Sequence, residues 1–202
     1  SWVGDGFYYS RYPAPASGLE YSAENEGHAV YYHSLGDKQE DDKLVYNDPE
    51  HPKRYHFVSV TEDRKILALQ ASTGTDGYET YIQHLDRADE TFKPLQKGFD
   101  FKNSVIHHAD GYIWVRSNRG ADNYRLLKIN AETLDWETAE EIIPESEHLL
   151  RSASTGGGKL FANYLEKASS HIYVLDYDGS NRKEIELPGV GCAGGFSGRE
   201  DR

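Results

Sequence analysis

The sequence predicts an all-β fold built from propeller blades. Three observations carry the prediction: short β-rich runs recur along the chain, hardly any stretch favours a helix, and two strand landmarks repeat with a period near 47 residues. Fifteen tyrosines add to it, because aromatic residues suit a pleated, half-exposed strand surface. A repeat of this length with about four strands is typical of a propeller blade.

Most of the chain divides into runs with the alternation or β-rich composition of strands. These runs are Phe7–Arg11, Ala29–Leu35, Lys43–Asn47, His56–Thr61, Lys65–Ala71, Glu79–Leu85, Tyr112–Ser117, Tyr124–Ile129, Lys159–Leu165, His171–Asp176 and Lys183–Leu187. Inner strands are expected near Trp2, Phe57–Val60, Val105–His107 and Leu149–Ala153. The stretch Ala131–Ile143 predicts a turn and an outer strand, with a short helix as the alternative, because several of its residues are mediocre helix formers.

The repeat is visible at two independent positions. Turns before an aromatic or aliphatic strand fall at Asp5, Asp63, Asp110 and Gly157, at separations of 58, 47 and 47 residues. The strand that follows repeats at Tyr31, Tyr81, Tyr124 and Ile172, at separations of 50, 43 and 48. Asp-Gly and Gly-Gly suit the turns because a tight hairpin needs positive φ. A β-sandwich is the alternative, and the shared register disfavours it.

The period divides the chain into blades at about 1–50, 51–98, 99–146 and 147–190, with the start of a further blade at 191–202. Residues 1–202 are thus expected to form part of a propeller domain. The loops that join second to third strands are Tyr12–Gly27, Ser72–Gly77, Ser117–Asn123 and Glu166–Ser170. These loops are expected on one face, where rim loops of propellers carry function.

Composition excludes several functions. The net charge of −12 argues against nucleic acid and anionic membranes as partners, which both select basic surfaces. No run approaches the length of a membrane-spanning helix. The lone Cys192 excludes a disulfide framework and a Cys-rich zinc site, and no motif calls for a cofactor. The absence of Met predicts a piece of a longer protein, whose compartment, cytoplasmic or periplasmic, stays open.

Several segments resemble the propeller domain of prolyl oligopeptidases. They are WVGDGFYYSRYP at 2–13, HAVYYHSLGDKQEDDKLVY at 28–46, DGYIWVRSNRGADNYRLLKIN at 110–130 and SASTGGGKLFANYLEKASSHIYVLDYDG at 152–179. The resemblance implies a seven-bladed propeller that caps an α/β-hydrolase serine peptidase, which cleaves short peptides after proline. It also implies that the partner is the catalytic domain of the same parent chain. At this period, the 202 residues cover about four of the seven blades.

The catalytic machinery is not found in the sequence. A hydrolase nucleophile needs G-x-S-x-G, and the nearest string, GGFSGR at 194–199, places Gly198 directly after Ser197. No catalytic residue is therefore predicted, and the chain is expected to be inactive alone. The parent protein would be the serine-type prolyl endopeptidase.

Other site signals favour structural roles. STGGGK at 154–159 lacks the Walker residues at both ends and predicts a hairpin turn. His107 and His108 are adjacent on a strand, so they point to opposite faces and are not expected to share a metal ion. The acidic segment DKQEDDK at 37–43 predicts a solvated connection, with calcium binding as the alternative.

One loop is a candidate site for substrate access. In the resembling enzymes the loop at Ser117–Asn123 is mobile and lies where the propeller meets the catalytic domain. The resemblance implies that Ser117, Asn118 and Arg119 help to gate access or, through the guanidinium, meet a substrate carboxylate. The alternative is a polar rim loop whose charges are merely hydrated.

Two hypotheses about the whole chain remain. In the first, it is part of the non-catalytic, substrate-gating propeller of a prolyl oligopeptidase-like peptidase. In the second, it is an independent scaffold or a carbohydrate- or protein-binding propeller, although sialidase-type Asp boxes are absent. Four blades of a seven-blade ring would leave two apolar blade faces uncovered, which favours self-association through those faces. The alternative is that the terminal blade frays while the middle two blades stay ordered.

Overall fold

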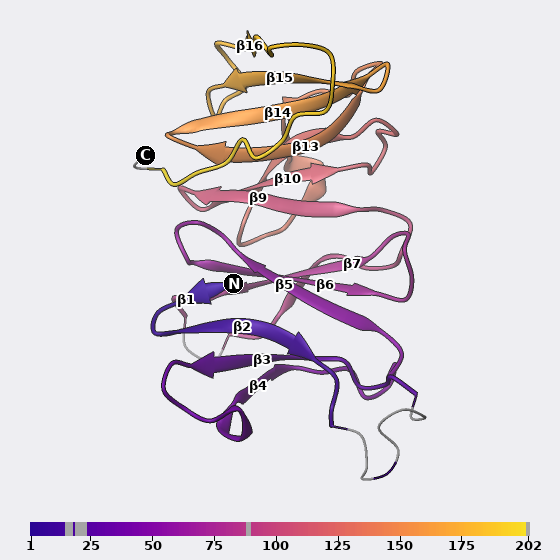
Figure 1. Ribbon diagram of the computed structural model, residues 1–202, viewed down its shortest axis with the longest axis vertical. Helices are drawn as coiled ribbons and strands as arrows, with labels where there is room; N and C mark the ends of the chain where they lie inside the picture. Colours follow the sequence, from indigo (N-terminus) through magenta and orange to yellow (C-terminus); the bar gives the residue numbers. More distant parts are fainter. Residues whose placement is uncertain (15–17, 19–23, 88–89, 201–202) are drawn as a thin grey trace. The chain divides into compact units, whose positions relative to one another are not determined.

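The chain folds into four antiparallel sheets. The computed structural model describes residues 1–14, 18, 24–87 and 90–200, and its sixteen strands form four four-stranded sheets (Figure 1). In every sheet the strands follow in sequence order, so each sheet is a simple meander. The prediction of an all-β fold with four-stranded blades is confirmed.

The strands fall into four consecutive groups. The first sheet contains β1 (Trp2–Val3), β2 (Gly6–Arg11), β3 (Ala29–Ser34) and β4 (Lys43–Tyr46). The second contains β5 (Tyr55–Val60), β6 (Ile66–Ser72), β7 (Glu79–His84) and β8 (Lys93–Gln96). The third contains β9 (Asn103–Ala109), β10 (Tyr112–Ser117), β11 (Arg125–Asn130) and β12 (Glu140–Ile143). The fourth contains β13 (Leu149–Gly156), β14 (Lys159–Glu166), β15 (Ser169–Leu175) and β16 (Lys183–Ile185).

The sheets belong to two compact units. Residues Ser1–Val60 and Arg64–Asp100 form the first unit, which holds the first and second sheets. Thr61–Asp63 and the residues from Phe101 onward form the second unit, which holds the third and fourth sheets. Within the described residues, no helix is long and apolar enough to cross a membrane.

The tight turns have the backbone geometry that their residues predict. Asp110 and Gly111 have φ of 52° and 77°, and Gly157 and Gly158 have φ of 56° and 72°. Positive φ at both central residues matches the right-handed twist of the flanking strands. The Walker-like string at 154–159 is therefore a hairpin turn between β13 and β14, as predicted.

The turn between β14 and β15 is tighter than expected. The sequence predicted a loop over Glu166–Ser170, but three of those residues belong to the strands. Only Lys167 and Ala168 remain in the turn, with φ of 46° and 63°. These residues adopt the positive φ without glycine, so this hairpin carries backbone strain.

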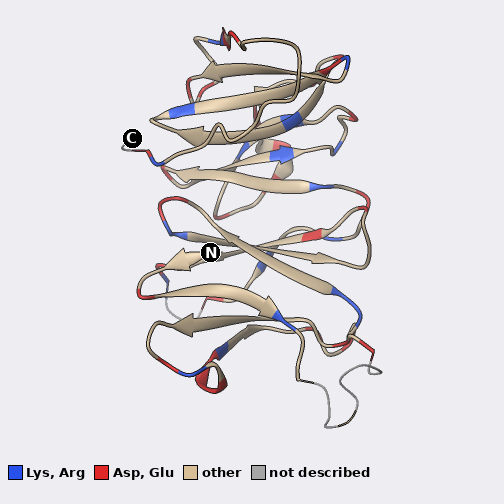
Figure 2. Ribbon diagram, viewed as in Figure 1, with Lys and Arg blue, Asp and Glu red and all other residues tan. Residues whose placement is uncertain are grey.

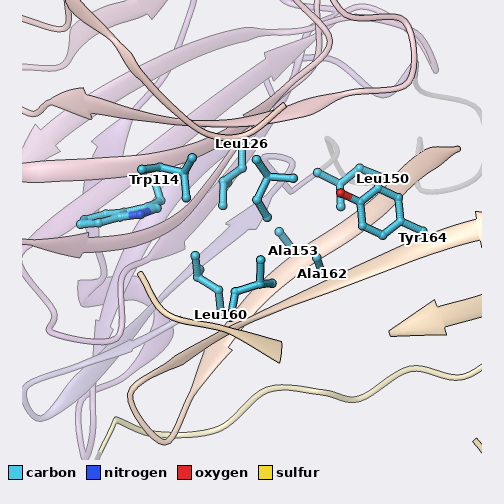
Figure 3. Packing of buried hydrophobic residues seen from close by; sticks show 10 residues of the cluster. Trp114, Leu126, Leu150, Ala153, Leu160, Ala162 and Tyr164 are labelled. Atoms are coloured by element: carbon cyan, nitrogen blue, oxygen red, sulfur yellow. The ribbon is translucent and has the colours of Figure 1, made fainter. Parts of the chain in front are cut away.

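Each unit has an apolar core. In the first unit it includes a strand that is buried on both faces, and in the second it is formed by side chains of both sheets. In the first unit, Ile66, Leu67, Ala68 and Leu69 of β6 are all buried, so both faces of this strand are covered. In the second unit, side chains from the third and fourth sheets pack into one cluster (Figure 3). Its members are Trp114, Leu126, Ile142, Ile143, Leu150, Ala153, Leu160, Ala162, Tyr164 and Leu175. Face-to-face burial of this kind supplies most of the stability of stacked sheets.

Two outer strands test the sequence interpretation. The stretch Ala131–Ile143 forms a short 3-10 turn, η2 (Trp136–Thr138), and then β12, so the turn and outer strand are confirmed. The Asp135 carboxylate accepts a hydrogen bond from the Glu137 N–H and caps the turn. The strand β8 was not predicted, because its sequence, KPLQ, contains a proline and has no alternation.

The C-terminal segment covers one face of the fourth sheet. Gly198 N–H donates to the Thr155 carbonyl at 3.0 Å, and Gly157 N–H donates to the Arg199 carbonyl at 2.8 Å. The rings of Phe161 and Phe196 lie 6.1 Å apart. Figure 1 shows this segment, in yellow, passing across the sheet. One of the two blade faces that the sequence analysis expected to be open is therefore covered by the chain itself.

Candidate functional site

The predicted access loop connects β10 to β11 in the third sheet, and its first residue is buried. The Ser117 side chain is 0% exposed. Its Oγ donates to Asn103 Oδ1 at 2.6 Å and accepts the Arg119 N–H at 3.0 Å. Because these bonds use the hydroxyl as donor and as acceptor, Ser117 anchors the loop to β9.

Asn118 fixes the loop to the chain before β9. Its Oδ1 accepts the Lys102 N–H at 2.7 Å, and its own N–H donates to the Lys102 carbonyl at 3.4 Å. The loop then turns, with Ala121 N–H donating to the Asn118 carbonyl at 3.2 Å and Gly120 at a φ of 65°. The Asn118 side chain thus accepts a backbone N–H that a neighbouring strand would otherwise bind.

Arg119 places a cation against two aromatic rings. Its guanidinium carbon lies 5.0 Å from the ring centroid of Trp136 and 5.9 Å from that of Phe101. Its carbonyl accepts a hydrogen bond from Arg125 at 3.0 Å, and Arg125 also bonds to Glu141 at 3.1 Å. Arg119 is half-buried. Arg119 is the charged member of the three predicted access residues, and its guanidinium lies against these aromatic rings.

The far end of the loop is tied to the segment before β13. Asn123 N–H donates to the Glu145 carboxylate at 2.7 Å, and Asn123 Nδ2 donates to the Ser146 carbonyl at 3.0 Å. The Asn123 carbonyl accepts the Leu150 N–H at 2.9 Å. Tyr124 follows at a φ of 63°, and β11 begins at Arg125. The loop is therefore anchored at both ends in this structure.

The other predicted rim loops belong to the first, second and fourth sheets. The loop Tyr12–Gly27 contains residues 15–17 and 19–23, which lie outside the described residues. The segment between β6 and β7 is held by Ser72, whose Oγ bonds to the Gly74 carbonyl and accepts the Gly74 N–H. The β14–β15 connection is the two-residue turn described above.

The two adjacent histidines on β9 have separate surroundings. The His107 ring stacks on the Tyr177 ring with centroids 4.4 Å apart. His108 Nδ1 lies 2.6 Å from the Asp63 carboxylate. Opposite orientation of these neighbours is confirmed. Over residues 1–14, 18, 24–87 and 90–200, no cluster of three or more His, Cys, Asp or Glu side chains has the arrangement of a metal site.

The acidic segment 37–43 contains a polar site that was not predicted from the sequence. Figure 2 shows the acidic residues of this connection beside β4, where η1 (Gln39–Asp41) forms. Asp42, predicted to be solvated, has a side chain only 1% exposed. It accepts hydrogen bonds from the Tyr9 hydroxyl and from His33 Nδ1, the latter at 2.7 Å. The prediction of a fully solvated connection is wrong at this residue, because the first sheet brings two distant donors to it.

Asp42 lines a hollow in the first sheet. Phe7, Tyr9, His33 and Gln39 complete a lining around about 280 Å³. Burial acts to raise the pKa of the Asp42 carboxyl, but the hydrogen bonds from Tyr9 and His33 outweigh it and hold the pKa below its usual range. In the sequence, the sign of this polar site is His33, a histidine within an aromatic strand.

Comparison with known proteins agrees with this architecture. The family model described as "Prolyl oligopeptidase, N-terminal beta-propeller domain" matches residues 1–202. The prolyl endopeptidase of Elizabethkingia miricola is 36% identical over 201 residues, which are 99% of this chain and 28% of that protein. The prolyl endopeptidase of Elizabethkingia meningoseptica is 35% identical over 201 residues, again 99% of this chain and 28% of the relative.

Solved structures agree as well. A structure from a study of two prolyl endopeptidases superposes with a TM-score of 0.83 at 28% identity, over 98% of this chain and 28% of that chain. Prolyl oligopeptidase B from Galerina marginata superposes with a TM-score of 0.87 at 23% identity, over the same shares, and shows likeness of fold alone.

The chain spans 28% of the length of its curated relatives, so most of each relative lies outside the matched region. The curated relatives are similar to the chain in the sequence of the matched region, and the solved structures are similar to it in fold. The chain belongs to the family of N-terminal β-propeller domains of prolyl oligopeptidases.

Proposed function

We propose that the chain is part of the propeller that controls access of short peptides to a prolyl-specific serine peptidase domain in the same parent chain. The family match over all 202 residues carries the proposal. Support comes from the relatives, which are named prolyl endopeptidases. One solved structure comes from a study of the role of inter-domain dynamics in catalysis and specificity. The chain carries no nucleophile elbow, so its role is non-catalytic.

Its domain organisation follows from the same proposal. Residues 1–202 form part of a propeller domain, with blades at about 1–50, 51–98, 99–146 and 147–190 and the start of a further blade at 191–202. Each sheet lies inside one of the first four ranges, which supports this division.

The loop that begins with Ser117, Asn118 and Arg119 is the access element of the proposal. Ser117 and Asn118 hold the loop through β9 and the chain before it. They keep Arg119 in place against Trp136. A guanidinium held in this way binds a carboxylate with good geometry, so Arg119 meets the acidic or C-terminal group of an entering peptide.

A second part of the proposal concerns self-association. Cross-strand partners place Trp2, Phe7, Tyr9, Tyr31 and Leu44 on one face of the first sheet. Trp2 is 62% exposed and Leu44 is 47% exposed. An aromatic face of this kind favours association of the isolated chain through a second copy.

A chimaera tests the access function. The matched 201-residue stretch of the Elizabethkingia miricola enzyme is replaced by this chain. The chimaera is expected to hydrolyse a fluorogenic Gly-Pro substrate and to spare unfolded casein. A version of the relative without the stretch is expected to lose discrimination by size. A chimaera that folds but cleaves casein as fast as that truncated version would overturn the proposal.

The isolated chain provides the second arm of this test. A purified protein of residues 1–202 is expected to leave the Gly-Pro substrate intact at every protein concentration tested. Turnover that disappears when one serine of the chain is replaced would contradict the non-catalytic role.

A further inference from the structure

A pair of buried histidines joins the first sheet to the second. His28 lies directly before β3 and is 8% exposed, and His56 lies on β5 and is 1% exposed. The His56 backbone N–H donates to His28 Nδ1 at 2.9 Å. In the opposite direction, His56 Nδ1 lies 2.6 Å from the His28 carbonyl oxygen. The two residues thus hold each other through a reciprocal pair of hydrogen bonds, the His28–His56 clasp.

The partners of these bonds determine where the protons are. A backbone N–H can only donate, so His28 Nδ1 must be unprotonated and its ring proton must sit on Nε2. A carbonyl can only accept, so His56 Nδ1 must carry a proton. The clasp therefore requires a neutral His28, since a proton on its Nδ1 removes the acceptor of the His56 N–H.

The position of β5 makes this acceptor necessary. β5 is the first strand of its sheet and pairs on one side only, with β6. Alternate N–H groups of such an edge strand point away from the sheet, and a buried N–H without a partner is costly. His28 supplies the missing partner for His56. The residues next to His28 in β3, Ala29 and Val30, are buried, so the clasp borders the core of the first unit.

Among the described residues, the side chains whose rings face the clasp are aromatic. The Tyr12 and Tyr55 rings lie 4.8 and 6.0 Å from the His28 ring, and the Tyr46 ring lies 5.1 Å from the His56 ring. Burial raises the pKa of Tyr12 and of Tyr46, so these two stay neutral in mild acid. Nε2 of His56 is buried and has no hydrogen-bond partner among the described residues.

Asp48, whose charge acts on His56, is paired with an arginine. Arg54 lies 3.1 Å from Asp48 and 3.3 Å from Glu79. Burial acts to raise the pKa of Asp48, but the hydrogen bond with His51 and the charge of Arg54 hold it below its usual range. Asp48 therefore stays ionised in mild acid, and a pH change near 6 acts on the histidines.

Burial lowers the pKa of both histidines in the folded chain, and for His28 the charge of the other histidine lowers it further. The unfolded chain takes up protons as the pH falls below the ordinary value of 6.5, while the folded clasp takes them up only at lower pH. The contribution of the clasp to stability is therefore fully present above about pH 6.5 and is lost as the pH falls below this value.

We propose that His28 and His56 form a proton-sensitive clasp between the first and second sheets. Above about pH 6.5 the neutral pair bonds β5 to the residue before β3. In mild acid, protonation of His28 at Nδ1 breaks the bond to the His56 N–H and leaves the pair held by the His56 Nδ1 bond to the His28 carbonyl. This property is independent of the proposed access function.

Amide hydrogen exchange of the full chain at pH 7.5 and 5.0 tests the clasp. After correction for intrinsic exchange, protection of the His56 amide is expected to fall by about tenfold or more between the two pH values. The reason is that an equilibrium linked to the uptake of one proton changes about tenfold for each pH unit below 6.5. His28→Asn is the matched control, because its side-chain oxygen stands near the position of Nδ1 and accepts a hydrogen bond without titrating. In this variant, protection is expected to stay constant within about twofold.

His28→Phe completes the set, because it keeps a ring of similar size and has no acceptor. It is expected to lose protection of the His56 amide at both pH values. An equal fall in wild type and His28→Asn would overturn the proposal, and so would constant protection in wild type. Long-range ¹H–¹⁵N spectra of the wild-type imidazoles give a test that needs no variant. Spectra that place the His28 ring proton on Nδ1 at pH 7.5 would also overturn the proposal.

Discussion

The guanidinium of Arg116 lies 3.5 Å from the ring centroid of Tyr124, while its Nε donates to the Leu150 carbonyl at 2.7 Å. One side chain of β10 thereby contacts the residue that follows the access loop and one residue of the first strand of the fourth sheet. The planar group can do both at once because its donors lie in the plane and its face stays free for the ring.

Arg116→Lys is expected to destabilise the second unit by about 1–2 kcal/mol, since lysine loses the stacked face and the directed bond to Leu150. Denaturant unfolding followed by tryptophan fluorescence measures the change. Arg151→Lys is the control, because Arg151 is exposed on β13 and has no ring or hydrogen-bond contact of this kind with the described residues. Equal midpoints for the two variants would contradict the assigned role of Arg116.

Arg119→Ala is expected to alter substrate choice in the chimaera more than stability. Cleavage of a prolyl peptide with a free C-terminal carboxylate should slow by roughly two- to fivefold relative to its amide, which is what an exposed ion pair contributes. The ratio of kcat/KM for the two peptides is the measurement. Arg182→Ala removes a comparable arginine that lies over Tyr173 and should leave this ratio unchanged.

Asp42 is expected to make the stability of the first unit depend on acid pH. Its folded pKa lies below the ordinary value of 3.8, so its contribution is present above that value and is lost as the pH falls through the folded pKa. Asp42→Asn should therefore be less stable than wild type at pH 7, and the difference should shrink below pH 3.8. Thermal unfolding from pH 7 to pH 2.5 measures it. Asp37→Asn, an exposed change in the same segment, should show no such convergence.

Ala168→Gly is expected to stabilise the fourth sheet by about 0.5–1 kcal/mol, because glycine adopts a φ of 63° without strain. The reverse change at the equivalent kind of turn, Gly158→Ala, should cost about 1–2 kcal/mol. Space around Gly158 is open, so this cost reports the backbone alone. Urea unfolding gives both values, and a destabilised Ala168→Gly would show that the turn is not strained.

The open face of the first sheet is expected to drive association of the isolated chain. Trp2→Ser combined with Leu44→Glu should keep the chain monomeric up to a higher protein concentration, because both changes remove exposed apolar surface. Light scattering across a dilution series measures this concentration. Val190→Ser is the control, since Val190 is 97% exposed and lies in the other unit. A wild-type chain that is monomeric at every concentration would contradict the association.

Local sequence determined the features that depend on a few adjacent residues. Asp110-Gly111 and Gly157-Gly158 predicted tight hairpins, because positive φ is a property of single residues. Alternating or aromatic runs predicted most strands, and the period near 47 predicted four sheets of four. The family resemblance, which the family model confirms, came from motifs of the same kind.

Tertiary structure decided the features that need residues far apart in the chain to meet. Asp42 is buried only because β2 and β3 bring Tyr9 and His33 to it, and nothing in the acidic segment itself signals that contact. The same holds for His28 and His56, which are 28 residues apart and whose proton positions follow from each other's backbone. The face of the fourth sheet is covered because residues 191–200 return to β13 and β14. Burial and pairing depend on distance in space, and local sequence patterns carry no information about that distance.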